Sequence, residues 1–99
     1  MNKIHLFSEK LILGCEVDEF MHRNDENYVY YLVGQNLKKF RNQKNMSIVK
    51  FARLCNYSEG FIKNIESPNY MQTFSVGTIW KFAEVLDIDI RDLFNPLEE

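Results

Sequence analysis

Proline, glycine and cysteine are scarce in this sequence. Its 99 residues include two prolines, four glycines and two cysteines, which leaves little material for long flexible linkers. Cys15 and Cys55 have no C-x-x-C partner, and only His5 and His22, without finger-like spacing, are available to complete a zinc site. We therefore expect no metal, no cofactor and two reduced thiols, of which Cys55 falls on an apolar helical face.

Long apolar runs are missing as well. No uninterrupted apolar stretch approaches the roughly 20 residues that span a bilayer, and residues 1–5 lack the features of a signal peptide. We therefore expect a cytoplasmic protein with no membrane partner. The sequence also shows no Ser–His–Asp or Cys–His set and no glycine-rich phosphate loop, so we do not expect an enzyme. The composition, 45% apolar and 26% charged, fits one folded domain.

The charges are distributed unevenly along the chain. Residues 1–33 carry a net charge of −3, residues 34–64 carry +6 and residues 65–99 carry −5. A basic middle segment between acidic ends favours a nucleic-acid partner. An ordinary solvated helical surface is the alternative interpretation of the same pattern.

Apolar residues recur at helical spacing from residue 27 onward. The pattern predicts five helices: residues 27–44, the segment from a cap at Ser47 to Asn56, the segment from a cap at Ser58 to just before Pro68, the segment from a cap at Ser75 through Leu86, and roughly residues 89–94. Val29, Val76 and Phe94 are among the residues expected to face the core. Tyr28, Tyr30, Tyr31 and Trp80 are also more typical of a core than of a ligand pocket.

The first 26 residues form a separate extension in this interpretation. Apolar residues alternate with period two around Ile4 and Leu6 and again from Leu11 to Val17, which favours a β-hairpin. A helix is the alternative, because Phe7 and Ile12 interrupt the alternation. The predicted division is an extension or dimerisation arm over 1–26 and a DNA-binding domain over 27–99.

Short motifs between residues 33 and 94 occur in an order that resembles a known family. They are VGQNLKKFR at 33–41, MS at 46–47, FA at 51–52, NYS at 56–58, IxxIE at 62–66, IxxFAxxLDI at 79–88 and LF at 93–94. Together they resemble the XRE/Cro-type helix-turn-helix family, which includes the lambdoid phage repressors. The resemblance implies an all-α, five-helix lambda-repressor-like domain and a structural ion pair between Arg41 and Glu66.

The resemblance also implies which residues contact DNA. In this arrangement the helix that begins after Ser58 lies in the major groove. The positions carried over for base reading are Glu59, Gly60, Lys63 and Asn64. Asn64 is suited to an adenine edge and Glu59 to cytosine N4, Gly60 permits close approach, and Lys63 is better suited to a phosphate. The expected phosphate contacts are Lys44, Ser47, Lys50, Asn69, Tyr70 and Gln72. An exposed polar residue without a DNA role is the alternative at each position.

The sequence departs from the family at several positions. Ile48 and Val49 stand where the family usually has glutamine and an acidic residue, and Leu54 stands where a polar residue is usual. We expect these three side chains to form an apolar patch, part of which the N-terminal extension covers, in the same chain or from a dimer partner. The loop before Ser75 is also about two residues longer than usual.

Two functions are compatible with this sequence. The first is a sequence-specific transcriptional regulator, a homodimeric repressor that binds double-stranded DNA at half-sites about 34 Å apart, with no small-molecule effector indicated. The second is a protein-interaction module on the same fold, an antirepressor or antitoxin-like regulator.

Overall fold

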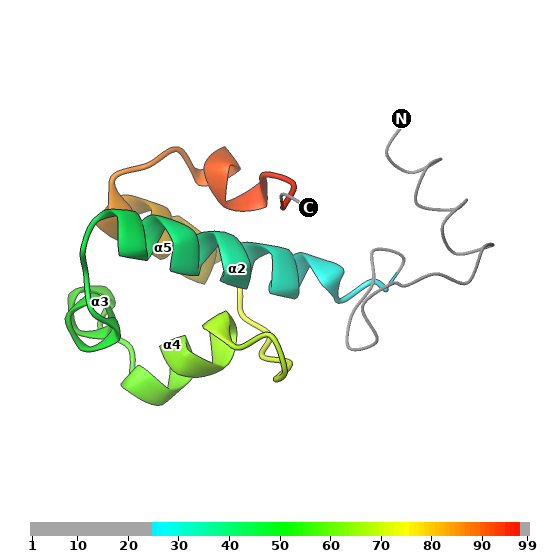
Figure 1. Ribbon diagram of the computed structural model, residues 1–99, viewed down its shortest axis with the longest axis horizontal. Helices are drawn as coiled ribbons and strands as arrows, with labels where there is room; N and C mark the ends of the chain where they lie inside the picture. The colour runs from blue at the N-terminus through cyan, green and yellow to red at the C-terminus, as the bar shows by residue number, and fades with distance from the viewer. Residues whose placement is uncertain (1–24, 98–99) are drawn as a thin grey trace.

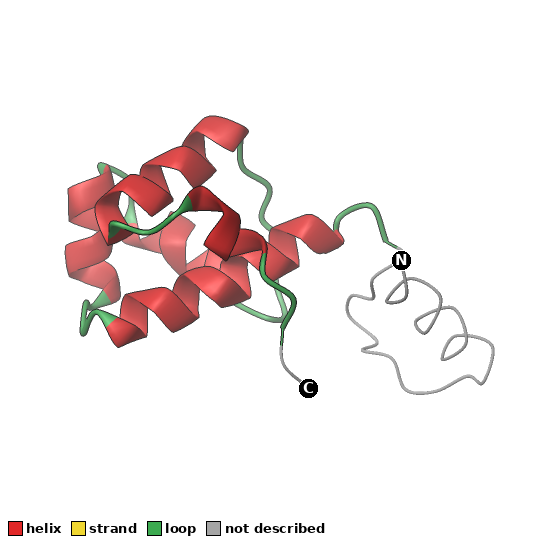
Figure 2. Cartoon of the chain, turned by 90° about the horizontal axis from the view of Figure 1, so that it is seen from above, coloured by secondary structure: helices red, strands yellow, loops and turns green. Residues whose placement is uncertain are grey.

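A computed structural model of the chain describes residues 25–97, and this part of the chain is helical (Figure 1). The elements are α2 (Tyr28–Gln43), α3 (Ile48–Cys55), α4 (Glu59–Glu66), α5 (Val76–Leu86) and the 3₁₀ helix η1 (Ile90–Phe94). No strand occurs between residues 25 and 97 (Figure 2). The predicted β-hairpin lies outside the described residues, and so does Cys15. The segment expected as a fifth helix is the 3₁₀ helix. Its hydrogen bonds span three residues, as from Asp92 N–H to the Asp89 carbonyl at 2.9 Å.

The predicted serine caps are present at the starts of three α-helices. Ser47 accepts a hydrogen bond from Lys50 N–H at 3.0 Å, and Ser58 and Ser75 occupy the same position at the starts of α4 and α5. Such a bond satisfies one of the backbone donors that a helix start leaves free. Asn27 stands at the N-cap of α2 but makes no side-chain capping bond.

Two α-helices end on residues in the left-handed conformation. Asn56 closes α3 with φ of 67°, and Asp87 closes α5 with φ of 57°. Asparagine and aspartate tolerate this region better than most residues because their short side chains bond locally. Asn56 thus ends α3 at the residue where the sequence predicted its end.

The helices enclose one apolar core, to which every described element contributes. Its buried members are Val33, Leu37, Phe51, Ala52, Cys55, Ile62, Ile65, Ile79, Phe82, Ala83, Leu86 and Leu93. Burial raises the pKa of the Cys55 thiol to about 11, because a thiolate is poorly solvated there.

Four expected core residues do not lie in the core. Val29 is 37%, Phe94 is 40%, Trp80 is 58% and Val76 is 75% exposed. Three of them stand at an end of an element, where fewer neighbours are available: Val29 is in the first turn of α2, which extends beyond the other helices (Figure 1). Trp80 lies inside α5, one position after the buried Ile79, and successive side chains on a helix point in different directions.

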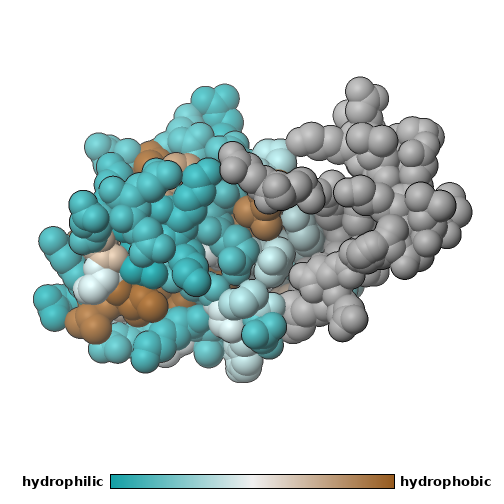
Figure 3. All heavy atoms as spheres, viewed as in Figure 1, coloured by the Kyte–Doolittle hydropathy of each residue, from teal (hydrophilic) through white to brown (hydrophobic). Residues whose placement is uncertain are grey.

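The apolar patch expected on α3 is smaller than predicted. Ile48 is partly buried and packs against the core, whereas Val49 and Leu54 remain 43% and 51% exposed. The cover proposed for this patch, the extension over 1–26, falls almost entirely outside the described residues. Figure 3 shows apolar atoms at the surface near α3 and α4, and smaller apolar areas elsewhere on a largely hydrophilic face.

Neither a membrane span nor a metal-ion cluster is found in residues 25–97. No helix there is both long and apolar enough to cross a bilayer. Histidine, cysteine and acidic side chains do not gather there in groups of three or more that would bind a metal ion.

Candidate DNA-binding surface

α3 and α4 form a helix-turn-helix unit whose turn is anchored to the core. The turn contains Asn56, Tyr57 and Ser58. The Tyr57 hydroxyl lies 3.0 Å from Oγ1 of the buried Thr78 on α5, and its ring packs edge-on against Phe82 with centroids 6.1 Å apart. These contacts fix the turn, and with it the position of α4 relative to α3.

The C-terminal end of α4 is held by α2. Arg41 Nε and Nη2 donate to the two carboxylate oxygens of Glu66 at 2.7 and 2.8 Å, so the structure contains the ion pair that the resemblance implies. Arg41 Nη1 also donates to the Met46 carbonyl at 2.6 Å. The hydrogen bonds to Glu66 raise the pKa of the Arg41 guanidinium above its usual value. Gln35 Nε2 donates to the Glu66 carbonyl at 3.1 Å and caps the end of α4.

α2 and α4 approach each other closely at Gly34. A Cβ atom at this position would collide with the backbone carbonyl of Ile65. Gly34 therefore permits the helix contact that brings Arg41 to Glu66. A glycine inside a helix is unfavourable by roughly 1 kcal/mol. A glycine within the predicted helix over 27–44 was therefore a signal of close helix packing at this position.

Asn36 is a second positioning residue that the sequence analysis missed. It is 1% exposed, and its Nδ2 donates to the carbonyls of Leu93 at 3.0 Å and Asn95 at 2.8 Å. It thus ties η1 to α2. Asn36 stands three residues after the buried Val33 and four residues before Phe40, which packs against the core. This spacing places a polar side chain on the apolar face of α2, and that was its signal in the sequence.

Three of the four predicted base-reading residues are exposed on α4. Glu59, Gly60 and Lys63 all lie on its solvent side, and nothing lies within 4 Å of the point where a Cβ on Gly60 would stand. Asn64 is half-buried, and its Nδ2 donates to Gln72 Oε1 at 3.4 Å. The face of α4 opposite the core is therefore open over its first two turns.

The predicted phosphate contacts divide into two groups around this face. Lys44 and Lys50 are exposed at the adjoining ends of α2 and α3, with the cap Ser47 between them. Asn69 and Tyr70 are exposed in the loop after α4, whereas Gln72 of the same loop bonds to Asn64 and, through Nε2, to the Thr73 carbonyl at 3.0 Å. Gln72 is thus directed toward α4 rather than freely into solvent.

The basic middle segment is slightly less positive at the surface than in the sequence. Arg41, one of its seven basic residues, is buried and neutralised by Glu66. The six others are exposed: Lys38, Lys39, Lys44, Lys50, Arg53 and Lys63. Glu59 is the segment's one acidic residue, so the exposed side chains of residues 34–64 carry a net charge of +5.

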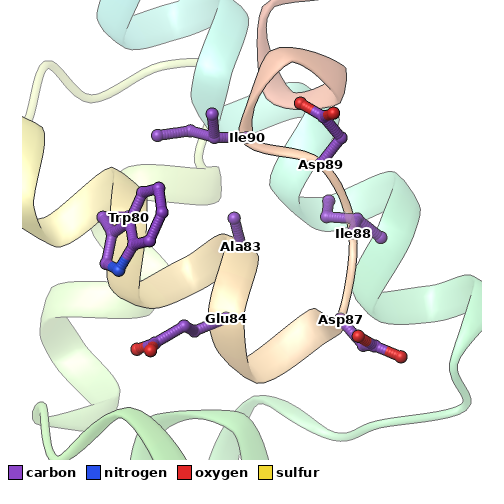
Figure 4. A pocket seen from close by; sticks show the side chains of 7 residues that line it. All are labelled: Trp80, Ala83, Glu84, Asp87, Ile88, Asp89 and Ile90. Carbon is purple, nitrogen blue, oxygen red and sulfur yellow. The ribbon is translucent and has the colours of Figure 1, made fainter.

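A hollow of about 390 Å³ lies between α5 and the start of η1. Trp80, Ala83, Ile88 and Ile90 supply its apolar lining, and Glu84, Asp87 and Asp89 supply carboxylates. Figure 4 shows Glu84 and Asp87 at one edge and Ile90 at the opposite edge. No predicted DNA-contacting residue lines this hollow.

Comparison with known proteins places this geometry in a family. A helix-turn-helix family model matches residues 37–93, more than half of the chain. The chain is similar to the restriction-modification controller protein C.AhdI from Aeromonas hydrophila, with 29% identity, a TM-score of 0.60, and coverage of 66% of this chain and 96% of that one. The hypothetical transcription factor NHTF from Neisseria shares the fold, with 21% identity, a TM-score of 0.64, and coverage of 83% and 88% of the two chains. No curated protein matches the sequence significantly. The chain therefore belongs to the XRE and lambda-repressor-like helix-turn-helix family, a family of DNA-binding transcription regulators.

Proposed function

We propose that this protein is a sequence-specific, homodimeric transcriptional repressor that inserts α4 into the major groove of DNA. The observation that carries the proposal is the exposure of Glu59, Gly60 and Lys63 on one face of α4, while Ile62 and Ile65 fix the opposite face in the core. A rigid helix with an open polar face is what base readout in the major groove requires.

Phosphate contacts would come from both sides of α4. Lys44 and Lys50, with the start of α3 behind Ser47, supply charge and backbone N–H groups on one side. Asn69 and Tyr70 supply polar side chains on the other. Because each neutralised phosphate adds about 0.9 to the salt slope of binding, affinity should fall steeply with rising salt.

The dimer would form through α5. Val76 and Trp80 lie one helical turn apart and are 75% and 58% exposed, and Trp80 also lines the hollow next to η1. Exposed apolar groups of this size commonly mark an interaction surface. Trp80→Glu should yield monomers in analytical ultracentrifugation, whereas Leu54→Glu, a matched change of an exposed apolar residue on α3, should leave the dimer intact. Monomers in both variants or in neither would refute this interface.

Binding to DNA upstream of the protein's own gene tests the function directly. A gel shift should show salt-sensitive binding of the wild type, and Asn64→Ala should weaken binding to the specific site far more than binding to random DNA. A good bidentate contact is worth about 1–3 kcal/mol of discrimination. Equal losses on both DNAs would contradict base reading by Asn64.

One observation favours the alternative, a protein-interaction module. The hollow beside Trp80 combines apolar walls with carboxylates from Glu84, Asp87 and Asp89, a chemistry that suits a basic protein partner and would repel DNA. An absence of DNA binding at about 50 mM salt, where phosphate contacts are strong, would favour this function over the first.

A further inference from the structure

We propose that Gln72 fixes the orientation of the Asn64 carboxamide and thereby sets which base α4 prefers at that position. This inference rests on the proposed function, since it takes Asn64 as a base reader. Gln72 lies in the loop between α4 and α5, not on α4 itself. In this proposal it does not contact the base but acts through Asn64 as a positioning residue.

The polarity of the Asn64 amide follows from a chain of hydrogen bonds. The Thr73 carbonyl can only accept, so the group that faces it must be Nε2 of Gln72, at 3.0 Å. This leaves Oε1 of Gln72 directed at Asn64, where it can only accept from Nδ2, at 3.4 Å. Asn64 therefore keeps one N–H and its Oδ1 available for another partner. The bond to Gln72 fixes which side of the amide carries the donor and which carries the acceptor.

The fixed orientation of the Asn64 amide matters because adenine presents an acceptor and a donor side by side in the major groove. N7 accepts and the N6 amino group donates, so an asparagine amide matches this edge in one orientation and meets two mismatched groups when it is flipped. Without Gln72, rotation about the terminal torsion of Asn64 exchanges the two orientations, because both are sterically similar.

The loop that carries Gln72 is held against the core. Phe74 packs edge-on against Tyr30 of α2 with ring centroids 5.1 Å apart and an interplanar angle of 87°, and it also contacts Phe82 of α5 at 6.2 Å. Ser75 follows directly and caps the start of α5. Gln72 thus stands two residues from a fixed aromatic anchor, which limits its movement relative to α4.

The test measures base discrimination in the full-length protein. The probes are the best duplex selected from random DNA and its single-base-pair variants, with Asn64→Ala used to identify the position that Asn64 reads. Gln72→Met, of similar length but without the acceptor, should lower discrimination at that position by about three- to tenfold, the equivalent of one ordinary hydrogen bond. The loss of discrimination should be confined to that position of the duplex.

Two further variants separate positioning from a structural or electrostatic effect. Gln72→Glu retains an acceptor, so discrimination should persist although the added negative charge weakens binding to every duplex. Thr73→Ala, in the same loop, changes an exposed side chain but retains the carbonyl that Gln72 faces, so it should leave discrimination unchanged. Circular dichroism and urea midpoints should show that all variants are folded.

The outcomes distinguish this inference from the proposed function. Undiminished discrimination in Gln72→Met, alongside its loss in Asn64→Ala, overturns the inference alone, and so does an equal loss at every position of the duplex. If the wild type selects no sequence from random DNA, the proposed function fails and the inference fails with it.

Discussion

Arg41→Met and Glu66→Met each remove one half of the pair that holds α2 to α4, and their combination tests whether the pair acts as a unit. The two side chains are 8% and 4% exposed, so each single change leaves a charge without a partner in a largely buried site. Two charge-assisted bonds at 2.7 and 2.8 Å are lost in either variant. At about 1.5–3 kcal/mol each, this agrees with the roughly 3–5 kcal/mol expected when a buried pair loses one partner.

The double variant should be more stable than the two single losses predict. No unpaired charge remains in it, and methionine fills the space of either side chain with flexible apolar atoms. We therefore expect a coupling free energy of about 2–3 kcal/mol from the double-mutant cycle. Arg41→Met should be the worse single change, because it also leaves the Met46 carbonyl without the bond at 2.6 Å.

Urea unfolding followed by circular dichroism is the assay, at low salt and at 1 M salt. The coupling should survive high salt because a buried pair is screened weakly. Arg91→Met is the control: Arg91 pairs with Asp89 at 2.8 Å on the surface, so its loss should barely move the urea midpoint. Single variants of Arg41 and Glu66 that behave like this control would refute the reasoning.

Three further changes test other parts of the structure. Gly34→Ala should destabilise the domain by about 1–3 kcal/mol in urea unfolding, because the new Cβ forces α2 away from the Ile65 carbonyl. Gly60→Ala should leave stability unchanged or raise it by up to about 1 kcal/mol, since nothing lies near the new Cβ, yet it should weaken DNA binding in a gel shift; unchanged binding would contradict close approach there. The buried Cys55 thiol retains its proton to a higher pH in the folded than in the unfolded chain, with its pKa raised from 9.0 to about 11. In a Cys15→Ser background, the stability that this proton difference supplies should therefore be complete below pH 9 and lost between pH 9 and 11. The urea midpoint should fall more over this range than in the same background with Cys55→Ala, and equal falls would argue against the shifted thiol.

Local patterns in the sequence determined most of the helices. The serine caps, the left-handed Asn56 and the apolar spacing depend on neighbours within one or two turns, so the sequence predicted α3, α4 and α5 close to their observed bounds. The ion pair between Arg41 and Glu66 joins residues 25 positions apart. It was expected only because the order of motifs resembles a family.

Only the tertiary structure decided which side chains are buried at helix ends and how the reading face is supported. Val76 and Trp80 lie in an apolar helix, but their exposure depends on whether another element covers them, and the described residues leave both side chains largely exposed. A phosphate contact was expected for Gln72, but its bond to Asn64 was not foreseen, because a loop's path depends on its anchor, here Phe74 between Tyr30 and Phe82. Helical periodicity can be recognised in a few consecutive residues. The contacts of Gln72 and Phe74 instead join segments that come close in space only when the core forms.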